Sequence, residues 1–328
     1  METDIIQKLK EADLRGRGGA GFPTYLKWEG VLKAEAPKKY IVCNAAEGEL
    51  DLKKDKYILE NYLEDVVLGI KIALDVIDNS SAYIYLNKEY FSLFENKLNN
   101  LIKDLDIKLI SEDNGYIGGE ESVALNVIEG IDPTPRKRPP FVSEKGLFGY
   151  PTLVNNVETF YCISKINKGE YIKNRFYMIV GKNIQGGIYE LKEGMTIEEI
   201  LKETNNYLDS PFYVQAGGGA VGEIMTKEEF NKPVIGEGFI RVVSYSEDPY
   251  ELMQRWAEFL VNGNCDKCTP CREGTYRILE MIKKRKLDVK ELEDLFLVLE
   301  KTSFCALGKG IPVPFRSLIN KVILKNNG

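Results

Sequence analysis

The sequence predicts an α/β domain, followed by a small domain rich in strands and a C-terminal bundle of helices. Strand-like and helix-like segments alternate up to about residue 168, which is typical of an α/β layer architecture. Short strands cluster beyond about residue 170, and the pattern is helical from about residue 247. Because 328 residues are too many for one simple core, we expect domains at 1–168, 169–244 and 245–328.

The first domain is expected to contain a sheet with helices between its strands. A proline-rich, basic segment at 132–141 predicts an extended loop near the end of the domain. The apolar patterns predict strands at 40–43, 82–86 and 107–110, and helices at 4–12, 55–77, 88–104, 120–129 and 155–166.

The second and third domains follow from shorter patterns. Thr196 precedes Glu198 and Glu199 and predicts a capped helix that ends at about Thr204. Strands that surround one helix favour a small β-grasp (ubiquitin-like) domain, and four successive helical patterns favour a four-helix bundle. The strands are expected at 176–180, 187–191 and 212–216, and the late helices at 247–262, 271–285, 288–301 and 312–325.

Composition excludes several classes of function. The formal net charge of -6 argues against a nucleic-acid-binding protein, and the short basic run at 283–286 is expected to be a solvated turn. The chain contains no histidine, which excludes a histidine base, a histidine metal ligand and a Ser-His-Asp triad. The longest apolar stretch, 66–77, carries two charges and is too short to span a bilayer. We therefore expect a soluble, cytoplasmic protein without direct membrane insertion.

Four cysteines form the most specific motif in the sequence. Cys265, Cys268 and Cys271 have C-x2-C-x2-C spacing, and Cys305 follows after a helix-length interval. This spacing is the ligation expected of a [4Fe–4S] cluster, whereas a structural zinc site, the main alternative, usually takes two separated pairs. No signal peptide precedes the motif, so disulfides are not expected. The other two cysteines, Cys43 and Cys162, are expected to be small buried hydrophobes.

A glycine-rich loop follows the first helix. Gly16, Gly18 and Gly21 match G-x-G-x-x-G, but a Rossmann fingerprint needs a strand directly before it, and here a helix is predicted. Clustered glycines still allow backbone N–H groups to approach a phosphate, with Arg15, Arg17 and Lys27 adding positive charge. The alternative is a flexible surface turn.

Two acidic loops are further candidates. The loop 43–49 follows a predicted strand, at the edge of an α/β sheet where ligands bind. The loop 116–122 opens a helix, and its glutamates Glu120 and Glu121 have capping charges as the alternative interpretation. Their occurrence together with the glycine loop favours one common site.

Taken together, the motifs resemble the flavoprotein subunit of respiratory complex I. The same type of subunit serves NAD-linked hydrogenases and formate dehydrogenases. The resemblance covers almost the whole chain, in family order, but lacks the N-terminal thioredoxin-like extension of some relatives. The matching strings are the glycine loop from Arg15 to Thr24, Leu26-Lys27-Trp28, Cys43-Asn44-Ala45, Gly119-Glu120-Glu121, Arg138-Pro-Pro-Phe141, Val154-Asn155-Asn156-Val-Glu-Thr159, Cys268-Thr-Pro-Cys-Arg-Glu-Gly274 and Cys305-Ala-Leu-Gly308.

The resemblance implies FMN held by the glycine loop, with NAD(H) stacked on it, and a [4Fe–4S] cluster on the four cysteines. Phe22 and Phe141 would sandwich the adenine, while Glu49, Glu120 and Glu121 would border the nicotinamide nucleotide, with Glu49 and Glu121 as catalytic candidates. The remaining cofactor-binding candidates are Gly16, Arg17, Gly18, Gly19, Lys27, Asn44, Glu47, Tyr116, Gly119, Val154, Asn155 and Asn156.

The chain departs from the family pattern at four places. Relatives carry an aspartate at Ala46 and Pro-Gly at Leu50-Asp51. They also carry an aromatic residue at Gly30 and a cysteine at Gly118. The aspartate is a hydrogen-bond acceptor for the flavin side chain, and the aromatic residue adds stacking area worth about 0.5–1.5 kcal/mol.

The sequence thus predicts an NADH dehydrogenase (diaphorase) subunit. Hydride transfer between NADH and FMN, followed by single-electron transfer through the cluster, needs no histidine. The expected partners are a small thioredoxin-like [2Fe–2S] subunit and the catalytic subunit of a hydrogenase or formate dehydrogenase, or of a bifurcating complex. The alternative, which the departures at Ala46 and Gly30 motivate, is a non-catalytic electron-wiring or scaffold subunit that has lost NADH binding.

Overall fold

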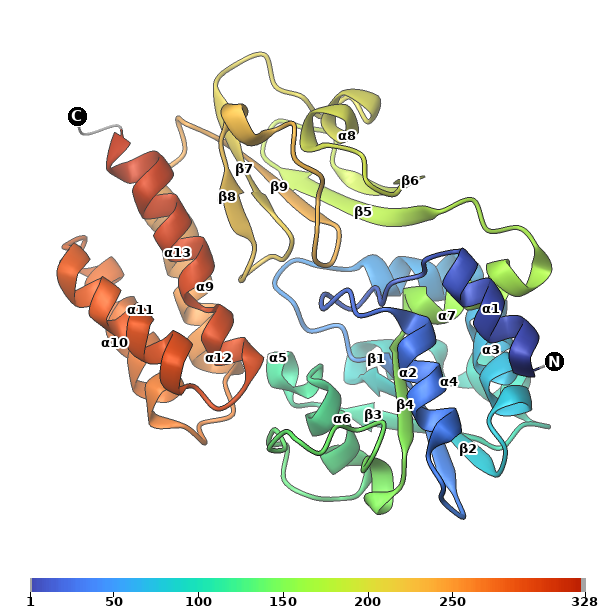
Figure 1. Cartoon of the computed structure of the whole chain (residues 1–328). Coiled ribbons are helices and arrows are strands. Elements are labelled where there is room, and N and C mark those ends of the chain that lie inside the picture. The colour runs from blue at the N-terminus through green and yellow to red at the C-terminus, as the bar shows by residue number, and fades with distance from the viewer. Residues whose placement is uncertain (1, 326–328) are drawn as a thin grey trace. The chain divides into compact units, whose positions relative to one another are not determined.

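A computed structural model describes residues 2–325 and divides the chain into two compact units. The first unit comprises the residues up to Gly48 together with Lys53–Asn174, and the second comprises Glu49–Leu52 and the residues from Arg175 onward. Figure 1 shows the strands and helices of both. Within residues 2–325, every helix is either too short or too polar to serve as a membrane span.

The first unit is built on a parallel sheet with strand order β3-β2-β1-β4. Its strands are β1 (Lys39–Ala45), β2 (Ser80–Asn87), β3 (Ile107–Glu112) and β4 (Thr152–Asn156). Its helices are α1 (Glu2–Glu11), α2 (Thr24–Lys33), α3 (Lys54–Val76), α4 (Lys88–Ile102), α5 (Gly115–Gly118), α6 (Glu121–Ile128) and α7 (Val157–Lys168), with a 3-10 turn at Leu147–Gly149.

Helices cover the parallel sheet on both faces. Three consecutive residues of β1, from Ile41 to Cys43, are buried, which requires cover on both sides of the strand. Helices α3, α4 and α7 pack against the strands, and α3 also packs along α7. Helix α6 covers the face that presents Val42 and Tyr85. These layers confirm the predicted α/β domain.

The second unit combines a mixed sheet with a helical region. The strand order is β6-β5-β9-β7-β8, with β5 and β9 parallel and β7 antiparallel to both of its neighbours. Its strands are β5 (Asn174–Gly181), β6 (Gly187–Lys192), β7 (Phe212–Ala216), β8 (Glu223–Met225) and β9 (Phe239–Ser244). Its helices are α8 (Ile197–Glu203), α9 (Pro249–Gly263), α10 (Thr269–Lys283), α11 (Val289–Thr302), α12 (Ala306–Gly310) and α13 (Pro312–Leu318), with a 3-10 turn at Lys227–Glu229 and a π-turn at Ile319–Ile323.

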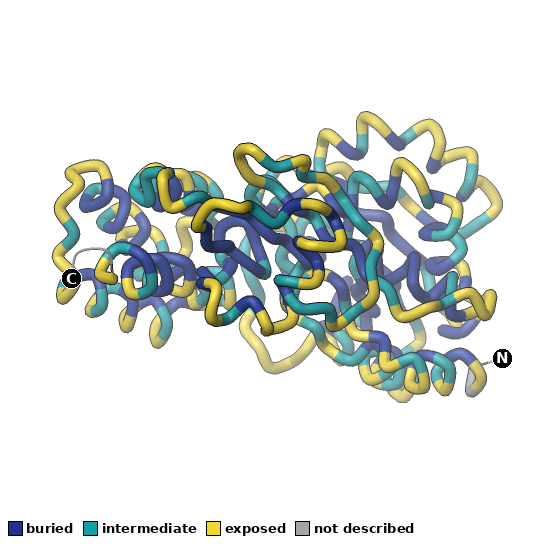
Figure 2. Tube along the Cα trace, turned by 90° about the horizontal axis from the view of Figure 1, so that it is seen from above, coloured by how far each residue is buried: buried dark blue, intermediate teal, exposed yellow. Residues whose placement is uncertain are grey.

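Local sequence explains where several of these elements begin. Thr196 and Glu199 form a reciprocal capping box that starts α8, as predicted. Asp248 caps α9, with Pro249 in its first turn, where a missing N–H costs nothing. In Figure 2, buried and exposed residues alternate along the helices, so that each helix turns one face to the core of its unit.

Several elements differ from the sequence-based expectation. The helix predicted at 155–166 starts later, at Val157, because Asn155 and Asn156 end strand β4. The strand was missed because its apolar run, Leu153-Val154, is only two residues long and leads straight into the helical pattern. Helix α2, the short helices α5 and α12, and strands β8 and β9 were also not predicted. The β-grasp and four-helix descriptions and the three domain boundaries stay predictions.

Candidate FMN and iron–sulfur sites

The order of the parallel sheet locates a candidate crevice. Strands β2 and β3 lie on one side of β1, and β4 lies on the other, so the strand order reverses between β1 and β4. Ligands of open α/β sheets bind outside the carboxyl ends of the strands at such a reversal. Asn44 near the end of β1 is the register partner of Asn156 at the end of β4. Two predicted site residues therefore stand side by side at this edge.

Asn44 ties the end of β1 to the loop before α6. Its side-chain amide donates to the carbonyl of Gly119 at 2.9 Å and accepts from the backbone N–H of Ala46 at 3.1 Å. A β-carbon on Gly119 would lie 2.9 Å from the Ala46 carbonyl oxygen, so only glycine allows this approach. The structure thus brings together Asn44 and Gly119, which the sequence placed in one site.

Glu47 is fully engaged in shaping the loop that follows β1. Its carboxylate accepts from the backbone N–H of Asp55, at 3.0 and 3.1 Å, and from the Tyr90 hydroxyl at 2.6 Å. Burial raises the pKa of Glu47 to about 7, and the charge of Asp55 adds to the shift. The contacts show that Glu47 caps the start of α3 and holds the loop that follows β1. At a cofactor, Glu47 would act first by positioning this loop.

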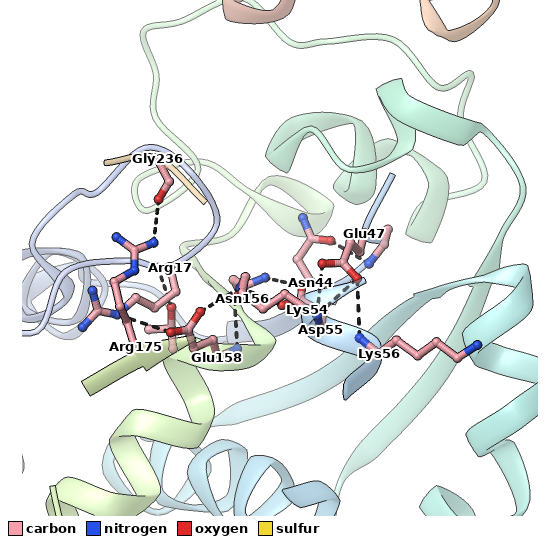
Figure 3. Close-up of polar contacts among 12 residues, drawn as sticks. Arg17, Asn44, Glu47, Lys54, Asp55, Lys56, Asn156, Glu158, Arg175 and Gly236 are labelled. Carbon is pink, nitrogen blue, oxygen red and sulfur yellow. Dashed lines mark hydrogen bonds and ion pairs between the residues drawn. The ribbon is translucent and has the colours of Figure 1, made fainter. Parts of the chain in front are cut away.

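A buried network of charges lies near the ends of β1 and β4 (Figure 3), and of its members the sequence pointed only to Asn156 as a site residue. Lys54 donates to Asp55 at 3.0 Å and to Glu158 at 2.7 Å, and all three are almost completely buried. Asn156 donates to Asp55 at 2.5 Å and accepts from the backbone N–H of Glu158, which caps α7. Burial alone would lower the pKa of Lys54, but the two carboxylates raise it above its ordinary value.

Arg17 connects the glycine loop to the same network. Its guanidinium lies 3.9 Å from Glu158 and donates to the Tyr171 hydroxyl at 3.2 Å, while its backbone N–H donates to Thr159 at 3.0 Å. The side chain is 2% exposed. From the sequence, Arg17 is expected to add positive charge near a phosphate. In the structure, its side chain and backbone anchor the glycine loop to the start of α7.

The glycine loop is folded onto the end of β4. An isolated bridge joins Arg15 to Pro23, and Gly16 N–H donates to the carbonyl of Phe22 at 2.9 Å. A β-carbon on Gly18 would lie 3.2 Å from the Asn156 β-carbon, whereas the positive φ values occur at Gly19 and Gly21. Gly18 is exposed beside Asn156 at the end of β4, and exposed glycine backbone of this kind fits the phosphate of a flavin nucleotide.

Lys27 and Glu121 form a charged pair at the β4 side of the crevice. Lys27 donates to Glu121 at 2.6 Å and to the carbonyl of Val154 at 3.2 Å. Glu121 also lies 3.4 Å from Arg138, which contacts Glu120 at 2.7 Å. Glu120 accepts from the first N–H groups of α6, so its role in the structure is that of a helix cap.

The other predicted residues of the first unit differ in how far they are exposed. Asn155 is buried and accepts from the indole N–H of Trp28 at 3.2 Å, so it supports helix α2. Tyr116 lies on the short helix α5, where it is partly exposed. Phe22 and Phe141 are 47% and 54% exposed, which leaves both rings accessible for stacking.

Glu49 belongs to the second unit, unlike the other predicted residues of the loop after β1. Its carboxylate accepts from the backbone N–H of Ala220 at 2.6 Å and from that of Leu50 at 3.2 Å. The side chain is 8% exposed. Glu49 and Glu121, the two catalytic candidates, are therefore positioned by different units.

The four motif cysteines gather at the helical end of the second unit. Cys268 precedes α10, Cys271 lies in its first turn, and Cys305 immediately precedes α12. Burial raises the pKa of Cys271 to about 12, and the neighbouring sulfurs of Cys268, Cys305 and Cys265 add to the shift. Within residues 2–325, none of these four cysteines is part of a disulfide.

A glycine permits the fourth cysteine to approach the other three. A β-carbon on Gly308 would lie 2.6 Å from the Ser303 hydroxyl and 3.5 Å from the Cys271 β-carbon. Among residues 2–325, no three Cys, Asp or Glu side chains surround a point as ligands of a single metal ion would. Four thiols, three with C-x2-C-x2-C spacing and one distant, suit a [4Fe–4S] cluster. The cluster is larger than a single metal ion, and its ligands bind at separate corners.

Matches to two known protein families cover the two candidate sites. Residues 9–165 match the Nuo51 FMN-binding domain, and residues 251–322 match the NADH-ubiquinone oxidoreductase-F iron–sulfur binding region. The first match contains the crevice between β1 and β4, and the second contains all four cysteines of the motif. Fold and sites define an oxidoreductase subunit that holds FMN and an iron–sulfur centre.

Individual relatives agree with this class. The chain is 30% identical to an F subunit of NADH-quinone oxidoreductase in Rhizobium meliloti, across 96% of this chain and 86% of the relative. It is 31% identical to the corresponding F subunit in Streptomyces coelicolor, with coverages of 96% and 80%. The chain therefore belongs to the family of NADH-quinone oxidoreductase F subunits, which confirms the resemblance seen in its motifs.

Hydrogenase subunits also belong among the relatives. The alpha subunit of the NAD-reducing hydrogenase HoxS of Cupriavidus necator is 31% identical across 97% of this chain and 59% of that protein. A crystal structure of an NAD+-reducing [NiFe]-hydrogenase in the H2-reduced state superposes with a TM-score of 0.91 at 28% identity. The superposition covers 98% of this chain and 61% of that hydrogenase chain. The names of the curated relatives identify each of them as a subunit of a larger complex.

Proposed function

We propose that this chain is the NADH dehydrogenase (diaphorase) subunit of a multisubunit redox complex. The observation that carries the proposal is the crevice at the carboxyl ends of β1 and β4, where the glycine loop folds onto Asn156 within the FMN-binding family match. FMN, when bound, exchanges hydride with NADH and single electrons with an iron–sulfur cluster. The residues of the chain bind and orient the two cofactors.

At the crevice, the proposed roles follow from the contacts. Gly18 and Gly19 let the loop backbone approach the flavin phosphate, and Asn44 and Lys27 supply polar contacts at the strand ends. Glu47, Arg17 and Asn155 hold the surrounding loops through their internal hydrogen bonds. We assign the remaining positions as in the family: Gly16, Tyr116, Gly119, Val154 and Asn156 to FMN, Phe22 and Phe141 to the adenine, and Glu49, Glu120 and Glu121 to the nicotinamide nucleotide.

The proposal extends to the domains and the electron path. We propose an FMN domain at 1–168, a β-grasp domain at 169–244 and a four-helix domain at 245–328 that holds a [4Fe–4S] cluster on the four motif cysteines. The mixed sheet around α8 supports the middle assignment, and the packing of α9 on α10 and of α10 on α11 supports the last. One cluster on one chain is not a terminal electron acceptor, so a partner is required.

The resemblance of the chain to its family suggests the partner. A small thioredoxin-like [2Fe–2S] protein would receive electrons from this chain. The complex would contain the catalytic subunit of a hydrogenase or formate dehydrogenase, or would be of a bifurcating type. The similarity to two hydrogenase chains supports the hydrogenase option.

The visible spectrum of protein purified without oxygen tests the proposal. We expect a flavin band that NADH bleaches, together with the broad absorbance of an iron–sulfur cluster. Cluster absorbance without flavin, or a flavin that NADH does not bleach, would contradict the diaphorase function and favour the electron-wiring alternative, since Ala46 lacks the carboxylate that relatives carry.

A variant of the glycine loop sharpens the test. The β-carbon in Gly18→Val would lie 3.2 Å from the Asn156 β-carbon, closer than an ordinary contact, and its two methyl groups would add bulk beside Asn156. We expect this variant to keep its iron and lose its flavin, because the cysteines belong to the second unit. A variant that retains full flavin occupancy and oxidises NADH would show that the crevice is not the flavin site.

A further inference from the structure

The loop after β1 contains a four-residue excursion, Glu49–Leu52, that belongs to the second unit although both flanking segments belong to the first. Asp51 is its third residue and has a φ of 61°, in the left-handed region that most side chains avoid. Aspartate and asparagine tolerate this region better than other non-glycine residues. A residue in such a conformation needs contacts that hold it there.

Two arginines supply those contacts to Asp51. One carboxylate oxygen lies 2.6 Å from Arg241 on β9 and 2.7 Å from Arg255 on α9, two elements labelled in Figure 1. Burial alone would raise the pKa of Asp51, but the hydrogen bonds and charges of the two arginines outweigh it and lower the pKa. Arg241 is 7% exposed and also donates to Gln215 on β7 at 3.3 Å. We call Asp51, Arg241 and Arg255 the arginine clamp.

The start of the same excursion is fixed by the loop after β7. Glu49 accepts from the Ala220 N–H at 2.6 Å, which is shorter than its 3.2 Å contact with the Leu50 N–H. A β-carbon on Gly219 would collide with the carbonyl oxygen of Leu50, so the two backbones touch. The hydrogen bond between Glu49 and Ala220 therefore depends on the position of the Leu50 backbone.

We propose that Asp51 is a positioning residue for Glu49, acting through the arginine clamp. The clamp keeps Asp51 in its left-handed conformation, which sets the direction of the Leu50–Asp51 backbone. That backbone keeps the Leu50 carbonyl against Gly219 and the Glu49 carboxylate on Ala220. The inference rests on the proposed function, in which Glu49 borders the nicotinamide, and it makes the clamp a determinant of NADH binding.

Asp51→Asn is the decisive variant, because asparagine has the same shape and tolerates the left-handed region but carries no charge. Two measurements are needed. The first is hydrogen exchange of the peptide spanning 216–222 in the full chain without NADH, which reports the Glu49–Ala220 hydrogen bond. The second is steady-state NADH oxidation by the flavin-loaded protein.

We expect the Ala220 amide to exchange about tenfold faster in Asp51→Asn. The hydrogen bond from the Ala220 N–H to the charged Glu49 carboxylate would be loosened, and such charge-assisted hydrogen bonds contribute more than neutral ones. We expect KM for NADH to rise about tenfold while kcat stays within about twofold, because the loosened contact is one that binds the nucleotide. Arg255→Gln, which removes a half-exposed partner and should fold normally, is expected to shift both quantities in the same direction by a smaller factor.

Arg316→Gln is the matched control. Arg316 also bridges two carboxylates, Glu293 and Glu300, within the second unit, and its loss should leave both quantities unchanged. Unchanged exchange at Ala220 in both clamp variants would overturn the proposal, as would faster exchange with an unchanged KM. Failure of the proposed function would look different, because wild-type protein would then lack NADH oxidation while the exchange measurement still reported on the clamp.

Discussion

Gly118 illustrates how a single residue is decided by its surroundings. The family pattern leads one to expect a cysteine here, but a β-carbon would collide with a carboxylate oxygen of Glu112. Glu112 is buried, and burial raises its pKa. Its carboxylate accepts from the Asn114 N–H at 2.7 Å, which fixes the turn before α5. Glycine at 118 therefore makes room for the acid that holds this turn.

Glu47 should make stability depend on pH. Its pKa is raised from 4.5 to about 7 in the folded protein, so its contribution to stability is complete below about pH 4.5 and is lost as the pH rises through about 7. Glu47→Gln cannot lose a proton. We expect the unfolding free energy of the variant, relative to wild type, to increase by up to about 3 kcal/mol between pH 5 and pH 8. Urea unfolding of cofactor-free protein measures this difference.

Glu229→Gln serves as the control for that series. The pKa of Glu229 is lowered to about 2 because its hydrogen bonds to Lys232 and Lys321 outweigh burial, which alone would raise it. Glu229 therefore stays ionised from pH 5 to pH 8, and its variant should differ from wild type by a constant amount. Parallel stability curves for Glu47→Gln and wild type would show that Glu47 does not titrate in this range.

At the scale of elements, neighbouring parts of the fold decide what each segment becomes. Helix α3 packs along α7 so closely that a β-carbon on Gly69 would collide with the carbonyl oxygen of Phe160. Helix α2 has no such constraint at Gly30, which is exposed and whose β-carbon would have no neighbour nearer than 3.8 Å. The two glycines look alike in the sequence and differ only in their tertiary environment.

Alanine substitutions at these two glycines should have opposite effects. Gly69→Ala should destabilise the protein by about 1–3 kcal/mol, because two helices must separate. Gly30→Ala should stabilise it by up to about 1 kcal/mol, because alanine favours a helix and its β-carbon would meet Ser143 only at an ordinary contact distance of 3.8 Å. Thermal unfolding of both variants checks the prediction. A stable Gly69→Ala protein would contradict the close packing of α3 and α7.

At the scale of the whole molecule, the FMN and cluster sites belong to different units. The crevice and its charged network lie in the first unit, while the four cysteines lie in the second. Only the excursion Glu49–Leu52 breaks the order of the sequence, since it belongs with residues beyond Arg175. No local pattern predicts that Glu49–Leu52 join the second unit, because Asp51 pairs with Arg241 and Arg255, about 200 residues away in sequence.

Removing one cysteine should therefore affect the units differently. Cys268→Ala is expected to lose its iron and to lower the unfolding temperature of the second unit, because metal binding contributes to folding. The flavin should remain. Cys162→Ala removes a buried thiol outside the motif and should keep the full iron content. Iron analysis and thermal unfolding provide the measurements, and a full complement of iron in Cys268→Ala would refute its assignment as a ligand.

The class of the first fold, the helical end of the chain and both cofactor motifs could be predicted from the sequence alone. Apolar periodicity reports local structure directly, and the spacing of cysteines and glycines reflects the chemistry of the groups they bind. Only the tertiary structure decided that Arg17, Glu47 and Asn155 turn inward to hold loops, and that Asp51 pairs with two distant arginines. The reason is physical: a polar side chain takes whichever partner the fold brings near it once water is excluded.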